Sequence, residues 1–212
     1  MAERYPKTIR AEAFCSALVA EYSEWLSMRG GQGARCDRER TESMLGSSAS
    51  RKLGNHGIIG KAATRIDHHL RVTSEDLKFD QIWWYFINSL SSGACVAPPS
   101  DWHSTGWYCG AVVEHENDPS PMKLIYDLRK LFVVRATLKA YVGYPASEMP
   151  SDEGSARLPD ESEPIMRNEC PDASESNYVL CMGPQVGKNV MPCAWSFYNW
   201  SAERETWSEL KA

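Results

Sequence analysis

The sequence predicts an α/β domain in which a central mixed β-sheet is flanked by helices. Three observations carry this prediction: a helix-spaced apolar pattern near the N-terminus, a strand–helix–strand pattern in the middle, and two strand-like segments near the C-terminus. The chain has 212 residues, which is enough to bury one substantial core. With no internal repeat in the sequence, we expect residues 1–212 to form a single domain.

The first part of the chain, residues 1–93, is expected to be mainly helical. Residues 8–28 carry apolar side chains at helical spacing, and Gly30 and Gly31 follow them. A second helix is expected after Ser74, which is a suitable N-cap. Its apolar stripe comprises Phe79, Ile82, Trp83, Phe86, Ile87 and Leu90.

Residues 94–145 form the predicted core, with a strand at 107–116, a helix and a second strand at 138–144. Ser120 and Pro121 predict where the helix begins, because Ser is a good N-cap and Pro is well tolerated at the first helical position. Strands joined by a crossover helix usually lie parallel in a sheet. We therefore expect a parallel pair of strands here.

The last third of the chain divides into two parts. Residues 146–175 hold nine acidic residues and two arginines, and this Pro- and Ser-rich composition predicts an acidic mobile insertion over 146–176. Residues 177–212 are expected to form the terminal strands, near 178–182 and 190–200, and a short helix after Ser201.

Composition narrows the class of protein. Apolar residues make up 42% and charged residues 24% of the chain, which excludes wholesale disorder. The sequence has neither an apolar run long enough to span a membrane nor a secretory signal, so we expect a cytoplasmic protein. Seven scattered cysteines without a C-x-x-C pair argue against a disulfide framework or a zinc ribbon.

Charge is distributed unevenly around a net value of −5. Residues 29–71 contain nine Lys and Arg against four acids, so this basic region could face phosphate groups. A solvated loop explains much of the same composition equally well.

One cluster of residues suggests chemistry. Glu114 and Glu116 follow the apolar run Ala-Val-Val and should project to the same side of a strand, with His115 on the other side. Together with Asp101, these carboxylates could bind Mg²⁺ or Mn²⁺, which prefer oxygen ligands. A polar strand end that enters a loop is the plain alternative.

Asp101, Glu114-x-Glu116 and the following helix and strand resemble the PD-(D/E)XK nuclease superfamily, which has the restriction-endonuclease-like fold. The resemblance covers about residues 94–144. It implies that Asp101 and Glu114 take the two acidic positions and hold Mg²⁺. Glu116 stands where the family usually has lysine, although a few restriction enzymes of this fold carry Glu-x-Glu.

The resemblance implies a metal-dependent nuclease that hydrolyses DNA phosphodiester bonds, with Asp101, Glu114, Glu116 and Lys123 as its catalytic residues. Glu116 would complete the metal site or orient water. Lys123 could replace the missing ammonium group, although an exposed helix lysine paired with Asp127 is the simpler interpretation.

Two alternatives remain open. The first is a catalytically inactive member of the same fold that binds DNA or a protein. The second is an interaction protein whose acidic insertion mimics nucleic acid or docks a basic partner. The sequence leaves the oligomeric state open, a homodimer included.

Overall fold

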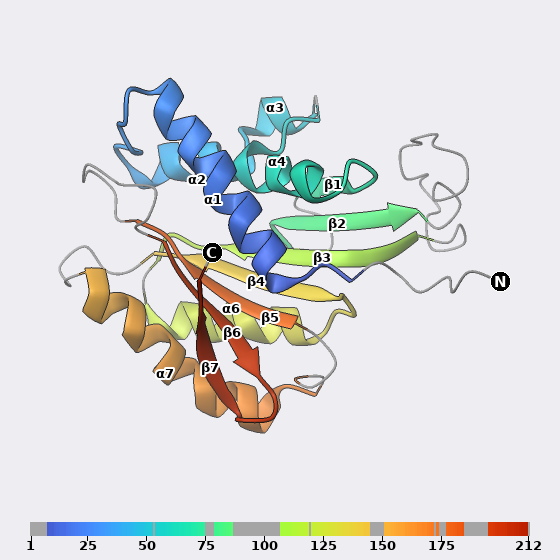
Figure 1. Ribbon diagram of the computed structural model, residues 1–212, viewed down its shortest axis with the longest axis vertical. Helices are drawn as coiled ribbons and strands as arrows, with labels where there is room; N and C mark the ends of the chain where they lie inside the picture. The colour runs from blue at the N-terminus through green and yellow to red at the C-terminus, as the bar shows by residue number, and fades with distance from the viewer. Residues whose placement is uncertain are drawn as a thin grey trace.

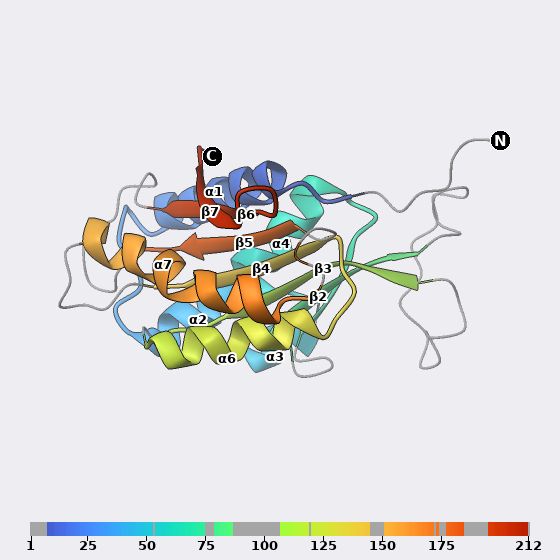
Figure 2. The same cartoon turned by 90° about the horizontal axis from the view of Figure 1, so that it is seen from below.

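The structure is a computed structural model that describes residues 8–52, 54–74, 79–86, 107–118, 120–144, 151–171, 173, 177–184 and 195–211. Within these residues, one mixed sheet of seven strands has helices on both sides (Figures 1 and 2). The strands are β1 (Arg71–Ser74), β2 (Gln81–Phe86), β3 (Trp107–His115), β4 (Leu138–Gly143), β5 (Asn177–Met182), β6 (Ser196–Ser201) and β7 (Thr206–Leu210). The helices are α1 (Ala11–Met28), α2 (Asp37–Leu45), α3 (Ser48–Lys52), α4 (Gly57–Ile66), α6 (Pro121–Phe132) and α7 (Ser151–Glu169).

The strands lie in the sheet in the order in which they occur in the chain. Strands β1, β2 and β3 pair antiparallel, β3, β4 and β5 pair parallel, and β5, β6 and β7 return to antiparallel pairing. The α/β class, the mixed sheet and the parallel pairing of β3 with β4 are therefore confirmed.

Each face of the sheet is covered by its own helices. Helices α1, α2 and α4 supply one apolar cluster, which includes Phe14, Leu18, Ile59, Trp83 and Val113. Helices α6 and α7 supply the other, and Figure 2 shows them side by side along the sheet, with α1 on the opposite side. Strand β3 lies inside the sheet, so its side chains reach both clusters.

The predicted core unit has the expected local structure. Ser120 caps α6, because its Oγ accepts the backbone N–H of Lys123 at 3.3 Å, and Pro121 occupies the first helical turn. Leu124, Leu128 and Leu131 of α6 are fully buried against the sheet.

The expectation of a helical part over residues 1–93 is wrong for its second half. Residues 71–74 and 81–86 form strands β1 and β2 instead of one helix after Ser74. The run Gln-Ile-Trp-Trp-Tyr-Phe is rich in residues that favour strands. Ile82 packs into one cluster and Trp83 into the other, so an apolar pattern that fits a helical stripe serves a strand buried on both faces. Ile87 and Leu90 lie outside the described residues.

The acidic mobile insertion predicted over 146–176 is also wrong, because residues 151–169 form α7. Leu158, Ser162 and Met166 recur at intervals of four and are buried, which places one face of this helix on the sheet. Ser162 Oγ accepts the indole N–H of Trp207 at 2.9 Å. The segment forms an amphipathic helix with few apolar positions, and its many acidic residues make the four-residue spacing of those positions hard to recognise in the sequence.

The short helix expected after Ser201 is a strand. A turn over residues 202–205 reverses the chain, and β7 then pairs antiparallel with β6. Trp200 and Trp207 lie opposite each other in this pair, and their rings pack edge to face with centroids 5.4 Å apart. The strands expected near 178–182 and 190–200 are found as β5 and, from residue 196, β6.

Candidate functional site

The end of β3 sends consecutive side chains to opposite sides of the sheet, as expected for a strand. Glu114 is buried under α6, whereas His115 points to the α1, α2 and α4 side. Glu116 follows β3 and continues its pairing, because its N–H donates to Val142 O at 2.9 Å. Glu114 and Glu116 thus both face α6, as the sequence predicted.

Helix α6 carries three charged residues toward these glutamates. Lys123, Asp127 and Lys130 are four and three residues apart, so they share one helix face. Lys130 Nζ lies 2.7 Å from Glu114 Oε1 and 3.5 Å from Asp127 Oδ1. Lys123 Nζ lies 3.0 Å from Glu116 Oε2 and 3.6 Å from Asp127 Oδ1.

Asp80, directly before β2, completes the group. Its Oδ2 accepts the backbone N–H of His115 at 2.7 Å, and its carboxyl group is close enough to that of Glu114 for the two to influence each other electrostatically. Asp80, Glu114, Glu116, Asp127, Lys123 and Lys130 are called the carboxylate cluster below. It holds four acids against two lysines.

Burial shifts the acid–base properties of the carboxylate cluster. Desolvation raises the pKa of Glu114 to about 8, and the nearby Asp80 and Asp127 add to this shift while Lys130 opposes it. Burial also raises the pKa values of Asp80 and Asp127. Burial and the neighbouring acids therefore favour the protonated form of Glu114 in the folded chain.

The two lysines remain charged. Burial lowers the pKa of Lys130, but its contacts with Glu114 and Asp127 outweigh burial and raise the pKa above the usual value. The hydrogen bond to Glu116 raises the pKa of Lys123. Both ammonium groups are therefore positioned donors beside the acids.

Hydrogen bonds in the loop after β3 connect the carboxylate cluster to residues on the opposite side of the sheet. Glu116 Oε1 accepts the backbone N–H groups of Asn117 and Asp118 at 2.7 and 2.9 Å. Asn117 Oδ1 in turn accepts Nε–H of Arg40, on α2, at 2.6 Å. Arg40 lies over the ring of Tyr144, with its guanidinium carbon 3.7 Å from the ring centroid.

The side chain of His115 takes no part in the carboxylate cluster. It is buried, with Nε2 3.0 Å from the hydroxyl of Tyr144, and burial with Arg40 nearby lowers the pKa of its imidazole to about 3. This agrees with the prediction that His115 serves packing and hydrogen bonding.

The structure brings an acid beside Glu114 that was not in the predicted set. Asp101 lies outside the described residues, and among these residues it is Asp80 that contacts Glu114. Asp80 lies 34 positions before Glu114, which is farther along the chain than Asp101. The pairing of Lys123 with Asp127 that the sequence suggested is found at 3.6 Å, whereas Lys130, on the same face of the predicted helix, was not among the predicted residues.

The predicted metal-ligand set includes Asp101, so only its two glutamates fall within the described residues. Among the described residues, one set of three acid, His or Cys side chains has ligand atoms all within 4.8 Å of one another, and it is Asp67, His68 and His69. In the carboxylate cluster, Lys130 and Lys123 lie beside the glutamates where a cation would bind.

The donor atoms of the carboxylate cluster nevertheless suit a hard divalent cation. Glu114 Oε1 and Asp127 Oδ1 are buried, and Lys130 Nζ lies 2.7 and 3.5 Å from them. Two lysines do not balance the four acids of the cluster, and buried excess charge is costly. Oxygen donors with an excess of negative charge fit Mg²⁺ or Mn²⁺, with Asp80, Glu114 and Asp127 as the groups that could hold it.

The basic region at residues 29–71 is largely paired with acids. Arg29 and Arg35 contact Glu39, Arg38 contacts Glu42, Arg40 contacts Asp37, and Arg65 contacts Glu21 and Glu24. These ion pairs lower the positive charge that the region can offer to phosphates.

Comparison with known proteins adds no assignment: no protein-family model, curated protein or solved structure gives a significant match to the chain. None of the described helices is both long and apolar enough to cross a membrane.

Proposed function

We propose that the protein is a metal-dependent nuclease of the restriction-endonuclease-like kind, which hydrolyses phosphodiester bonds in DNA at the carboxylate cluster. One observation carries the proposal: the desolvated pair of Asp80 and Glu114 at the end of β3, faced by the lysines of α6. Strongly shifted pKa values with identifiable charged neighbours are typical of functional sites.

Under this proposal, the residues of the carboxylate cluster have different roles. Asp80, Glu114 and Asp127 would hold Mg²⁺ or Mn²⁺, which supplies water activation and screens the charge that grows on the phosphate. Glu116 Oε1 is held by two backbone N–H groups, so Glu116 Oε2 can orient a water molecule. Glu116 thereby contributes without the lysine that the resemblance would place at this position.

The lysines of α6 supply the missing positive charge. Lys123 Nζ is 3.0 Å from Glu116 and 38% of its side chain is exposed, so it can reach a bound phosphate. Lys130 contacts Glu114 in the metal-free protein. A bound cation would release Lys130 from this contact, because it would neutralise the same carboxylate.

The alternative is a catalytically inactive domain of the same kind that binds DNA or a protein. One observation favours it: Lys123 and Lys130 already form ion pairs with Glu114, Glu116 and Asp127. The two functions differ in whether a divalent cation binds at all.

The test is nicking of supercoiled plasmid DNA by the purified chain with Mn²⁺ or Mg²⁺, alongside the thermal shift that each metal causes. We expect nicking with metal and none in EDTA, and Glu114→Ala and Asp80→Asn should each reduce the rate at least about 100-fold. Asp118→Asn removes an exposed carboxylate from the same strand end and is the matched control, which should keep its activity.

Equal nicking by wild type and Glu114→Ala would assign the activity elsewhere and overturn the proposal. Absence of both nicking and a metal-dependent thermal shift would favour the inactive binding domain. In that case, DNA binding by the metal-free protein separates a DNA-binding from a protein-binding module.

A further inference from the structure

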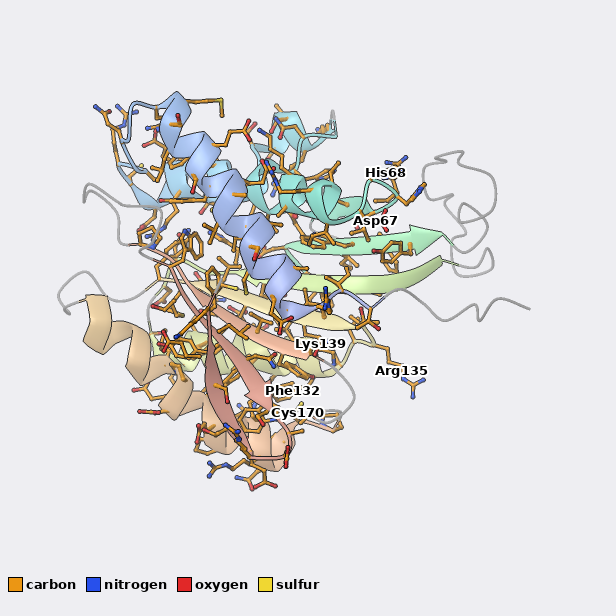
Figure 3. The ribbon with its side chains drawn as sticks, viewed as in Figure 1. Asp67, His68, Phe132, Arg135, Lys139 and Cys170 are labelled. Atoms are coloured by element: carbon orange, nitrogen blue, oxygen red, sulfur yellow. The ribbon has the colours of Figure 1, made fainter. Side chains whose placement is uncertain are left out.

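A second group of possible metal ligands lies at the turn between α4 and β1, away from the carboxylate cluster. Asp67, His68 and His69 each offer one ligand atom, and these atoms all lie within 4.8 Å of one another. Figure 3 shows Asp67 and His68 beyond the end of α4, beside the end of β2. Asp80 precedes the same strand at its other end, so the two groups are separated by the length of β2.

The local backbone brings the three side chains together. Asp67 ends α4, and Leu70 N–H donates to Asp67 O at 3.0 Å, which closes a turn over residues 67–70. Asp67 Oδ1 accepts the backbone N–H of His69 at 2.9 Å inside this turn. The rings of His68 and His69 lie with their centroids 3.9 Å apart, so both imidazoles face the same space as the carboxylate.

The surroundings of Asp67 favour a bound cation. The hydroxyl of Tyr85, a buried residue of β2, lies 3.4 Å from Asp67 Oδ2 and can donate to it. Such a partner fixes the orientation of a ligating carboxylate. The C-terminal end of α4 adds partial negative charge at the same place.

The imidazoles are available as ligands. His68 is exposed and His69 half-buried, and within the part of the chain that the structure describes neither ring forms a hydrogen bond with a protein group. His56 makes a useful contrast, because its Nδ1 lies 2.8 Å from Ser74 Oγ. Two imidazole nitrogens and one carboxylate oxygen suit Zn²⁺ and related transition metals, whereas Mg²⁺ prefers oxygen ligands alone.

We propose that Asp67, His68 and His69 form a binding site for a divalent transition metal, Zn²⁺ first among them, that is independent of the carboxylate cluster. Three protein ligands leave the remaining coordination positions to water or to an exogenous group. The bound ion would join the α4–β1 turn to β2 through Asp67 and Tyr85. The site therefore links metal binding to the stability of this edge of the sheet.

The test is titration of the full chain, first stripped with EDTA, with Zn²⁺ by calorimetry. We expect one saturable Zn²⁺ site whose affinity falls at least about tenfold in His68→Ala and in His69→Asn. His56→Asn removes an imidazole from outside the site, and Glu114→Gln alters the carboxylate cluster. Both should bind Zn²⁺ like wild type. Because His68 is exposed, His68→Ala should fold normally, which circular dichroism can verify.

Copper provides a second measurement on the same proteins. The electron paramagnetic resonance spectrum of bound Cu²⁺ should show coupling to two imidazole nitrogens in wild type, and His68→Ala should lose one of them. Unchanged Zn²⁺ affinity in His68→Ala would overturn the proposal. Loss of Zn²⁺ binding in Glu114→Gln instead would assign the ion to the carboxylate cluster and would equally overturn it.

Discussion

At the end of β3, burial shifts the pKa of a titratable side chain in opposite directions on the two sides of the sheet. On the α6 side, Glu114 is buried among other acids and lysines, and desolvation raises its pKa to about 8. On the α2 side, His115 is buried against Tyr144, and desolvation lowers its pKa to about 3. Burial favours the neutral form of both groups, but His115 has a neutral partner, the hydroxyl of Tyr144, whereas Glu114 lies beside the charged Lys130 and near the acids Asp80 and Asp127.

This difference separates a side that is held by neutral and cation–π contacts from the side that carries the proposed site. The His115 side is held by the Tyr144 hydroxyl and the Arg40 guanidinium, both of which stabilise the fold. The Glu114 side keeps several charges of both signs in a small volume, which costs stability unless a ligand offsets it. Adjacent residues of one strand thus serve the fold and the proposed function separately.

The largest expected effect on stability comes from a substitution on the His115 side of the sheet. Tyr144→Ala removes a buried ring that contacts Arg40 and His115, so the free energy of unfolding should fall by about 3–5 kcal/mol. Urea denaturation measures the loss, and the control is Tyr126→Ala, which removes an exposed ring of α6. Equal losses in the two variants would contradict the assigned role of Tyr144.

The second prediction concerns Glu114, on the α6 side of the sheet, where a substitution should raise the free energy of unfolding instead of lowering it. The pKa of Glu114 is higher in the folded than in the unfolded chain, so its contribution to stability is present below about pH 4.5 and is lost as the pH rises through about 8. In EDTA at pH 9, Glu114→Gln should therefore be more stable than wild type by about 1–3 kcal/mol.

Denaturation of both proteins at pH 5 and pH 9 measures this difference. The increase in the free energy of unfolding caused by Glu114→Gln should be smaller at pH 5, where folded Glu114 is already protonated. A gain of the same size at both pH values would show that Glu114 stays ionised in the folded chain.

The smallest expected effect distinguishes the two lysines. Lys123→Met removes an ion pair that is partly exposed, so the free energy of unfolding should change by less than about 1 kcal/mol. Lys130→Met removes the cation nearest to buried Glu114 and should raise the pKa of that carboxyl group further. Carbon-detected NMR of the Glu114 carboxyl group follows the pKa, and an unchanged value in Lys130→Met would contradict the 2.7 Å contact.

Local signals made the centre of the fold predictable. Ser120 and Pro121 define the start of α6 through chemistry within a few residues, and the apolar run before Glu114 defines β3. The same signals placed Glu114, Glu116 and Lys123 correctly relative to one another. Each of these predictions depends on neighbours in the chain.

Features that depend on distant partners were missed. An apolar run such as residues 81–86 fits a helix or a buried strand, and pairing with β1 and β3 decides between them. The position of Asp80 beside the end of β3 follows from that pairing, so Asp80 could not be recognised while residues 79–90 were expected to form a helix. Helix α7 was missed because its few apolar positions become recognisable only beside Trp207 and the sheet.

The agreement between strand order and chain order has a consequence for synthesis on the ribosome. Each strand pairs with the strand made just before it, so the sheet can grow by successive addition as the chain emerges. Every residue of the carboxylate cluster lies between positions 80 and 130. These residues can therefore come together before β5, β6 and β7 have been translated.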